Sequence, residues 1–200
     1  MHCIILSSYM ITQILQTWPG TIDQNRYNTI PFKKVDEPNG WLGNMSRHPL
    51  RVPRSTGGTL YPTAEHYFQC ERFKDLAIRQ AILSKNSPMS CKMIAKRHGV
   101  HMTIPPRSLA DLALMRRTIR LKLENHPTLQ TQLLALPEDG IIIENASARR
   151  SKSASYWGMR LDQHGIWTGE NWLGRLWMEL RLELEESGAI TDKVGTPQPA

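Results

Sequence analysis

Residues 61–73 read YPTAEHYFQCERF, and the fold prediction starts from this stretch. Its Pro-Thr pair is typical of a helix start and predicts a helix over 64–74. On that helix Glu65, Gln69 and Arg72 stand at i, i+4 and i+7, so they share one face. A carboxylate beside an amide and a guanidinium can orient a water molecule or stabilise a developing cation. The alternative is a solvated glutamate with an arginine ion pair, because exposed pairs of this kind are common and individually weak.

Further helices are predicted along most of the chain, with a few short strands between them. The expected helices cover 75–83, the segment from Ser87-Pro88 to just before Gly99, the segment that begins at Ser108, 128–136 and 171–186, and the expected extended pieces cover 30–34, 50–52 and 141–143. Helices on a small set of strands indicate an α+β domain that is predominantly helical, not a doubly wound sheet. We expect one domain over 27–186, an N-terminal extension over 1–26 and a flexible C-terminal tail over 187–200.

The composition indicates a globular, basic chain. With 200 residues, 40% of them hydrophobic, it can bury one core, and six tryptophans argue against disorder. The mean hydropathy is −0.42 and the apolar stretches are shorter than the roughly 20 residues of a bilayer span, so we expect no membrane partner. The net charge of +7 fits a partner that carries phosphate, and it fits a basic enzyme equally well. Three widely spaced cysteines favour a reducing, cytoplasmic location.

Two other groups of side chains are weaker candidates for chemistry. His66 and Cys70 stand at i, i+4, but such helical pairs arise often by chance and no third orienting group is identifiable. The spacing of Cys91, His98 and His101 matches no zinc pattern. Neither a P-loop nor a G-x-G-x-x-G element that opens a helix occurs, so NTPase and Rossmann functions have no local support. We expect neither a metal nor a redox cofactor.

Basic residues gather in two runs, one over 116–122 and one over 149–152. Each run is a solvated face in the simplest interpretation, and Arg116 is expected on such a face. The second run precedes the aromatic loop Tyr156-Trp157-Gly158, where basic groups can hold a phosphate while a ring stacks on the substrate. Guanidinium groups bind phosphate oxygens in a bidentate manner, so we expect phosphate contacts from Arg72 together with some of Arg149, Arg150 and Lys152.

Several motifs, taken in order, resemble one protein family. They are WLGNMSRHPL with Asn44, the 61–73 stretch, Ser87-Pro88, Lys122, Glu144, Tyr156-Trp157-Gly158 and GENWLG over 169–174. Over about 27–184 the chain is similar to the NADAR superfamily, also called YbiA-like. The resemblance implies an α+β NADAR domain and an enzyme that hydrolyses N-glycosidic bonds. The implied substrates include phosphoribosyl-amine intermediates of riboflavin synthesis and ADP-ribose attached to guanine.

The resemblance also assigns roles to particular residues. Glu65 matches the catalytic carboxylate, and the positions that match the family's pocket are Asn44, Trp157, Gly158, Asn171 and Gly174. The family's usual lysine is Arg72 here, which excludes a Schiff base at that position. Ala154-Ser155 stand where the family has an acid. A carboxylate suits the oxocarbenium-like sugar of this reaction, and Asn44 or Asn171 would bind the leaving base.

Three alternative functions from different classes fit these sequence features. The favoured one is an N-glycosidase for an ADP-ribosyl or phosphoribosyl small molecule, or for ADP-ribosylated nucleic acid. The second is a catalytically silent module that binds ADP-ribose-like or NAD-like ligands, and the third is a nucleic-acid-binding protein that uses the basic runs. Under the favoured function, Asn171, Gly174 and Trp157 should line one cleft with Glu65. Glycine inside a helix costs about 1 kcal/mol relative to alanine, and we expect a ligand close to Gly174 to account for it.

Overall fold

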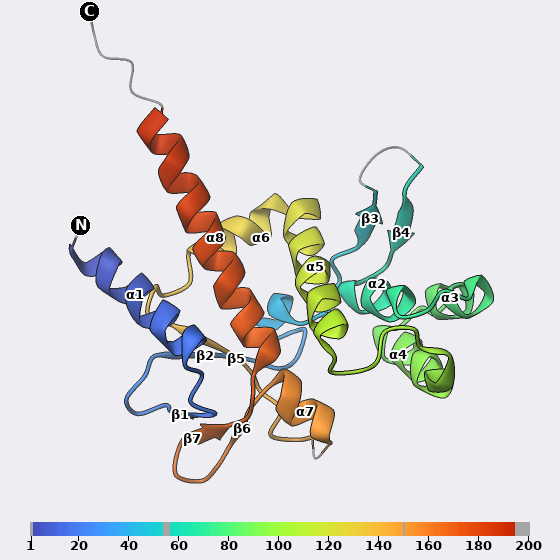
Figure 1. Cartoon of the computed structure of the whole chain (residues 1–200), viewed down its shortest axis with the longest axis horizontal. Coiled ribbons are helices and arrows are strands. Elements are labelled where there is room, and N and C mark those ends of the chain that lie inside the picture. The colour runs from blue at the N-terminus through green and yellow to red at the C-terminus, as the bar shows by residue number, and fades with distance from the viewer. Residues whose placement is uncertain (1, 54–56, 150, 195–200) are drawn as a thin grey trace, which may run out of the picture.

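The computed structural model describes residues 2–53, 57–149 and 151–194, which form a predominantly helical α+β fold (Figure 1). The helices are α1 (His2–Gln16), α2 (Ala64–Glu71), α3 (Leu76–Leu83), α4 (Pro88–Arg97), α5 (Leu109–Asn125), α6 (Pro127–Leu134), α7 (Lys152–Trp157) and α8 (Trp172–Val194). The strands are β1 (Thr21–Asp23), β2 (Thr29–Phe32), β3 (Leu50–Val52), β4 (Thr59–Tyr61), β5 (Ile141–Glu144), β6 (Arg160–Leu161) and β7 (Ile166–Thr168). The predicted fold class is confirmed.

Side-chain caps explain where four of the helices begin. The side chains of Thr63, Asp75, Ser87 and Ser108 accept hydrogen bonds from backbone amides in the first turns of α2, α3, α4 and α5. Pro88 follows its cap at the first helical position, where its missing amide hydrogen is no loss. The starts of α2, α4 and α5 agree with the caps that the sequence predicts.

Three small sheets join distant parts of the chain. β2 pairs in parallel with β5, so that Ile30 lies opposite Ile142. β1 and β6 flank β7 in an antiparallel sheet, and β3 and β4 form an antiparallel pair. The isoleucines at 141, 142 and 143 are 0% exposed, which places β5 in the centre of the core. α8 packs directly on this strand.

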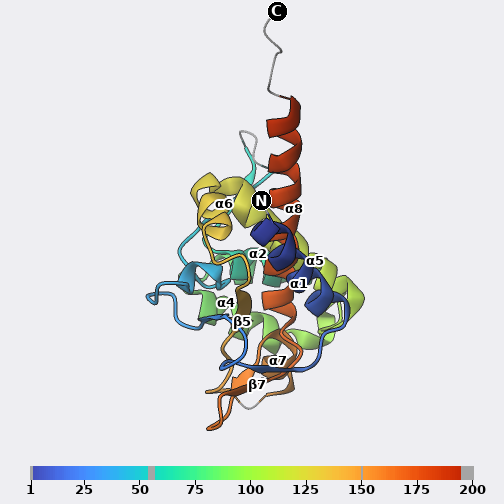
Figure 2. The same ribbon diagram turned by 90° about the vertical axis from the view of Figure 1, so that its left-hand side faces the viewer.

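Both ends of the chain depart from their sequence predictions. The segment 1–26, expected as an N-terminal extension, contains β1, whose backbone pairs with β7. Before it, α1 packs along α8, as Figure 2 shows. α8 continues to Val194, past residue 186 where the sequence analysis ends it. One glycine, Gly188, costs only about 1 kcal/mol inside a helix and does not stop it. Residues 195–200 of the expected tail lie outside the described residues.

The aromatic segment before Gly158 is helical. It forms α7 in place of the expected loop, because Ser151 caps it and accepts a hydrogen bond from the amide of Ala154. The chain then forms the β6–β7 hairpin, which the sequence analysis does not contain. Within the described residues, no helix has the length and apolarity needed to cross a bilayer.

Candidate functional site

α2 carries the three residues predicted to share one face, and it is almost entirely buried. Glu65, Gln69 and Arg72 are 4%, 3% and 7% exposed. α2 packs against α3, α4 and α5, which removes this polar face from water (Figure 1). The solvated alternative for Glu65 is therefore wrong. A buried polar face of this kind needs hydrogen bonds within the fold.

The carboxylate of Glu65 is held at one oxygen. Its Oε1 accepts a hydrogen bond from Nε2 of Gln69 at 2.9 Å, and Nζ of Lys92 lies 3.7 Å from the same atom. Lys92 belongs to α4, and its side chain is 47% exposed, so it marks the side from which solvent reaches the site. Among the residues that the structure describes, Oε2 has no hydrogen-bond partner. That oxygen can accept a proton or a hydrogen bond from a ligand.

Asn44 lies next to Glu65 because their backbones are joined. The amide of Glu65 donates a hydrogen bond to the carbonyl oxygen of Asn44 at 2.9 Å. The side-chain Nδ2 of Asn44 lies 3.1 Å from Sδ of Met115, while Oδ1 is buried and has no partner within the described part of the chain. An unpaired buried amide oxygen is unfavourable, so a hydrogen-bond donor on a ligand would stabilise it.

A buried lysine fixes the loop that carries this asparagine. Nζ of Lys122 donates hydrogen bonds to the carbonyl oxygens of Trp41 and Gly43 and to Oγ of Ser46, the last two at 2.9 and 2.7 Å. Burial lowers the pKa of Lys122 to about 7. In the sequence, Lys122 belongs to the basic run over 116–122. The signal for its burial is the spacing from Met115, because i and i+7 share a helix face.

Arg72 makes its ion pair inside the fold. Its Nε and Nη2 donate hydrogen bonds to Oδ1 of Asp111 at 2.9 and 2.6 Å, and Asp111 is 0% exposed. This corrects the expected phosphate contact of Arg72, since its guanidinium fork is occupied by a carboxylate. Asp111 is not among the site residues predicted from the sequence. Its position four residues before Met115 is the signal that it faces the core.

Aromatic rings join α2 to α7 and α8. The ring centroids of Phe68 and Trp157 lie 5.9 Å apart with perpendicular planes. Tyr156 contacts Trp157 at 4.9 Å and Trp172 at 6.1 Å. Tyr156 and Trp157 are partly exposed, so their rings are available to stack on a ligand. The structure thus brings Trp157 to the helix that carries Glu65.

Asn171 and Gly174 have a different environment. Oδ1 of Asn171 accepts a hydrogen bond from the amide of Glu144 at 3.1 Å, and its Nδ2 donates to the carbonyl oxygen of Ile142 at 2.8 Å. A Cβ on Gly174 would lie 2.1 Å from that same carbonyl oxygen. Close contact of α8 with β5 therefore accounts for both residues, in place of the expected ligand. Gly158 is similar, since its Cβ would lie 2.2 Å from the carbonyl oxygen of Glu144.

The basic residues expected to hold phosphate together with Arg72 differ in their partners. Arg149 forms an ion pair with Glu144, with Nη2 2.7 Å from Oε1. Lys152 is exposed at the start of α7. Arg150 lies outside the described residues. Of the two that the structure describes, Arg149 is paired with a carboxylate, and Lys152 is exposed without a carboxylate partner among the described residues.

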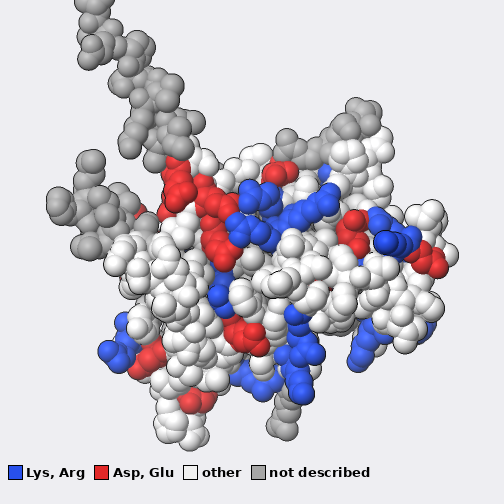
Figure 3. Space-filling model, in the orientation of Figure 1, with Lys and Arg blue, Asp and Glu red and all other residues white. Residues whose placement is uncertain are grey.

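The other basic run faces acidic residues of α8. Arg116 donates hydrogen bonds to Glu179 and Glu183, and Arg120 donates to Glu183 at 2.5 Å. In the orientation of Figure 3, acidic (red) and basic (blue) side chains lie next to one another on this face of the molecule. Arg116 keeps 37% of its side chain exposed, as expected for a solvated face, and both of its terminal nitrogens also pair with α8. The pairing also leaves less of this run for contacts with nucleic acid phosphates.

The remaining candidate clusters have structural roles. The ring nitrogens of His66 lie 2.8 Å from Oγ1 of Thr63 and 2.9 Å from the carbonyl oxygen of Lys85, so neither faces Cys70. Burial raises the pKa of Cys70 to about 12, which keeps it a thiol. In the described part of the chain, no three or more His, Cys, Asp or Glu side chains form a group that could hold a metal ion.

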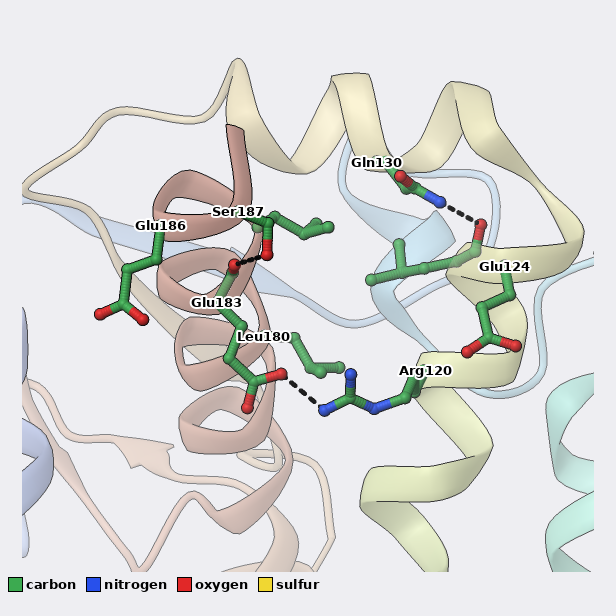
Figure 4. A pocket seen from close by; sticks show the side chains of 9 residues that line it. Arg120, Glu124, Gln130, Leu180, Glu183, Glu186 and Ser187 are labelled. Atoms are coloured by element: carbon green, nitrogen blue, oxygen red, sulfur yellow. Dashed lines mark hydrogen bonds and ion pairs between the residues drawn. The ribbon is translucent and has the colours of Figure 1, made fainter. Parts of the chain in front are cut away.

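Two hollows in the surface do not include Glu65. A groove of about 420 Å³ lies between α5 and α8, and the ion pair of Arg120 with Glu183 crosses it (Figure 4). A hollow of about 360 Å³ lies at Trp41 and His48. Neither contains a buried carboxylate with an open oxygen. The candidate site is therefore defined by the chemistry around Glu65.

Residues 31–185 match the family model described as the NADAR domain. The chain is 32% identical over 158 residues to the N-glycosidase YbiA of Escherichia coli, which covers 78% of this chain and 88% of that protein. It is 27% identical to a riboflavin biosynthesis protein of Vibrio vulnificus, with 78% of this chain and 39% of that protein covered. The NMR structure of Escherichia coli YbiA matches with a TM-score of 0.58 and 31% identity, over 81% of this chain and 88% of that one.

Proposed function

This chain belongs to the NADAR domain family as an enzyme that hydrolyses N-glycosidic bonds, and we propose that its substrate is a base joined to a phosphorylated ribose. The ribose would be part of an ADP-ribosyl or phosphoribosyl group, as in ADP-ribosylated guanine or a riboflavin-pathway intermediate. The observation that carries this proposal is the buried carboxylate of Glu65. Its Oε1 is held by Gln69, while Oε2 has no partner among the described residues.

Glu65 is the catalytic carboxylate of this reaction. As the bond between C1′ of the ribose and the base nitrogen breaks, the electron pair leaves with the base and the sugar gains oxocarbenium character. A carboxylate next to C1′ stabilises that positive charge. Oε2 accepts a proton from the water that attacks C1′, and the same proton can pass to the leaving nitrogen. One water is consumed, and the products are the free base and the ribose with a hydroxyl at C1′.

Asn44 and Trp157 are the proposed contacts of the base. The unpaired Oδ1 of Asn44 is an acceptor for an N–H group of the base, and bonding would relieve its unsatisfied burial. Trp157 lies against Phe68 on the helix of Glu65 and keeps part of its ring exposed for stacking. Together they would orient the leaving group.

The phosphate contact is proposed for Lys92. Its Nζ is the one cationic group within 4.0 Å of Glu65 among the described residues, and its exposed side chain can turn toward an anion. A lysine ammonium binds phosphate as a point charge, without the fixed fork of an arginine. This assignment replaces Arg72, whose fork is occupied by Asp111.

The test is release of free base from defined substrates. The full chain is incubated at low ionic strength with ADP-ribosylated guanosine or with a phosphoribosyl-amine pyrimidine, and the base is measured by chromatography. We expect release from at least one substrate. Calorimetric binding without release would favour the silent binding module, for which Ala154-Ser155 in place of an acid is the specific observation. Binding to nucleic acid that weakens steeply with salt would favour the third function.

A further inference from the structure

A row of buried polar side chains connects α5 to the proposed catalytic carboxylate. It begins at Asp111, passes through Arg72 and Gln69, and ends at Glu65. Each of these residues is at most 7% exposed. Buried networks of this kind are stable when every donor faces an acceptor, so the direction of each hydrogen bond matters.

Asp111 anchors the guanidinium of Arg72. Oδ1 of Asp111 accepts hydrogen bonds from Nε and Nη2, and Oδ2 accepts one from the backbone amide of Arg107 at 2.7 Å. The guanidinium also lies over the ring of Phe68, 4.2 Å from its centroid, and Trp157 packs perpendicular to that ring. These contacts fix both the position and the plane of the guanidinium.

The remaining nitrogen of Arg72 determines which way the Gln69 amide points. Nη1 donates to Oε1 of Gln69 at 3.4 Å, and Nε2 of Gln69 donates to Oε1 of Glu65 at 2.9 Å. A guanidinium has donors only, so it favours the amide oxygen on its own side. The amide nitrogen must then face Glu65. With the amide reversed, a carbonyl oxygen would face the carboxylate and a donor would face the guanidinium, and both contacts would be repulsive.

We propose that Arg72 and Asp111 are positioning residues, which act on Glu65 by fixing the orientation of the Gln69 amide. The inference rests on the proposed function, because it takes Glu65 as the catalytic carboxylate. It assigns Arg72 to the interior of the site, without contact to the substrate's phosphates. Lysine cannot replace it, since a single ammonium does not supply three donors in a fixed plane.

The test is a double-mutant cycle of Arg72→Lys and Gln69→Ala, read as kcat and KM. Arg72→Lys should lower kcat about tenfold and leave KM within about twofold, because a misplaced catalytic group loses rate more than binding. In the Gln69→Ala background, Arg72→Lys should have no further effect on kcat, because its action passes through that amide. Arg116→Lys, in a more exposed ion pair, is the matched control and should leave kcat and KM unchanged.

Two kinetic results would overturn the proposal. A rise in KM with unchanged kcat would place Arg72 against the substrate, and additive losses of kcat in the double variant would show that Arg72 acts independently of Gln69. If Arg72→Lys does not fold, the paired change Arg72→Met with Asp111→Leu removes both buried charges at once. Such replacements are often tolerated. The paired variant should show the same loss of kcat.

A second measurement separates this inference from the proposed function. The side-chain NH₂ protons of Gln69 can be followed by NMR hydrogen exchange, which needs no substrate. Exchange should be faster in Arg72→Lys than in the wild type or in Arg116→Lys, because the amide then rotates. Equal exchange in all three would overturn the positioning role. If the wild type releases no base from either substrate, the proposed function fails, and the exchange rates still decide whether Arg72 orients Gln69.

Discussion

The polar face of α2 and the contact between α8 and β5 are both built from buried polar groups, yet they differ in how those groups are satisfied. At the α8–β5 contact, both ends of the Asn171 amide are bonded to the backbone of β5. On the α2 face, Oε2 of Glu65 and Oδ1 of Asn44 have no partner within the described residues. The Asn171 amide is satisfied within the chain, whereas the open oxygens of Glu65 and Asn44 can accept hydrogen bonds from a ligand.

The difference separates two kinds of sequence motif that look alike. A glycine, an asparagine or a glutamate at a motif position indicates that few other side chains fit there. Either close packing within the fold or contact with a ligand can impose that restriction. The satisfied amide of Asn171 indicates packing, whereas the open oxygens of Glu65 and Asn44 lie on neighbouring residues of the fold and indicate a ligand. An unpaired atom alone does not mark a ligand site, since Oε2 of Glu144 and Nε of Arg175 are also buried without a partner among the described residues. Substitutions at the α8–β5 contact should therefore change stability more than rate, and substitutions on the α2 face should do the reverse.

The largest effect on stability is expected for Asn171→Ala. The change leaves the amide of Glu144 and the carbonyl of Ile142 without their side-chain partner, and it places alanine at a φ of 52°. We expect a loss of about 3 kcal/mol in the free energy of unfolding, measured by denaturant titration. Activity per folded molecule should stay within about twofold of the wild type. Asn25→Ala, at an exposed asparagine, is the control, and a loss below about 1 kcal/mol at Asn171 would contradict the packing role.

Gly174→Ala should have the next largest effect. Its new Cβ would lie 2.1 Å from the carbonyl oxygen of Ile142, so α8 must move away from β5. We expect a loss of about 2 kcal/mol from this overpacking. Gly188→Ala is a matched control on the same helix, because its Cβ would meet no atom within 4 Å. That variant should gain up to about 1 kcal/mol from helix propensity. Equal effects of the two changes would remove the argument for close packing.

The smallest effect concerns pH and the loop that carries Asn44. Burial, together with the charges of Lys122 and His126, lowers the pKa of His48 from 6.5 to about 4. The unfolded chain then binds a proton at higher pH than the folded one, so the contribution of His48 to stability is present above pH 6.5 and is lost as the pH falls to about 4. His48 is only partly buried, so solvent screening reduces the effect and the change should be about 1 kcal/mol.

Thermal melts between pH 7 and pH 4 measure this contribution. His48→Gln should flatten the dependence of the melting temperature on pH, while His164→Gln, at an exposed histidine, should leave it as in the wild type. An unchanged slope in His48→Gln would contradict the assignment. Neither variant should alter the contacts of Glu65, because both lie outside its hydrogen-bond partners.

The parts of the fold that could be predicted from the sequence depend on local interactions. The caps at Thr63, Ser87 and Ser108 lie within four residues of the amides they bind, and the starts of three helices follow from them. β1 depends on pairing with β7, a distant segment, which a single sequence does not reveal. The β6–β7 hairpin is local, but its strands have only two and three residues, too few to show an alternating pattern. α7 has six residues, too few for a helical period to be seen.

In the candidate site, too, contacts within one helix could be predicted from the sequence and contacts between distant segments could not. The spacing of Glu65, Gln69 and Arg72 correctly predicts that they share a face, because that relation lies within one helix. The partner of Arg72 could not be predicted, since Asp111 is 39 residues away on α5. The role of Gly174 could not be predicted either. A helical glycine indicates a close neighbour, but the sequence does not say whether that neighbour is a ligand or a strand.

The central claim is that Glu65 is the catalytic carboxylate, and Glu65→Gln tests it most directly. The measurement is the rate of base release from the substrate that the wild type turns over, with stability measured on the same samples. Glu71→Gln is the matched control, because Glu71 lies on the same helix and pairs with Arg79 at the more exposed end of α2. We expect Glu65→Gln to lower kcat by about 100-fold or more with ligand affinity and fold nearly intact. Glu71→Gln should stay close to the wild type. Equal rates for the wild type and Glu65→Gln would contradict the account.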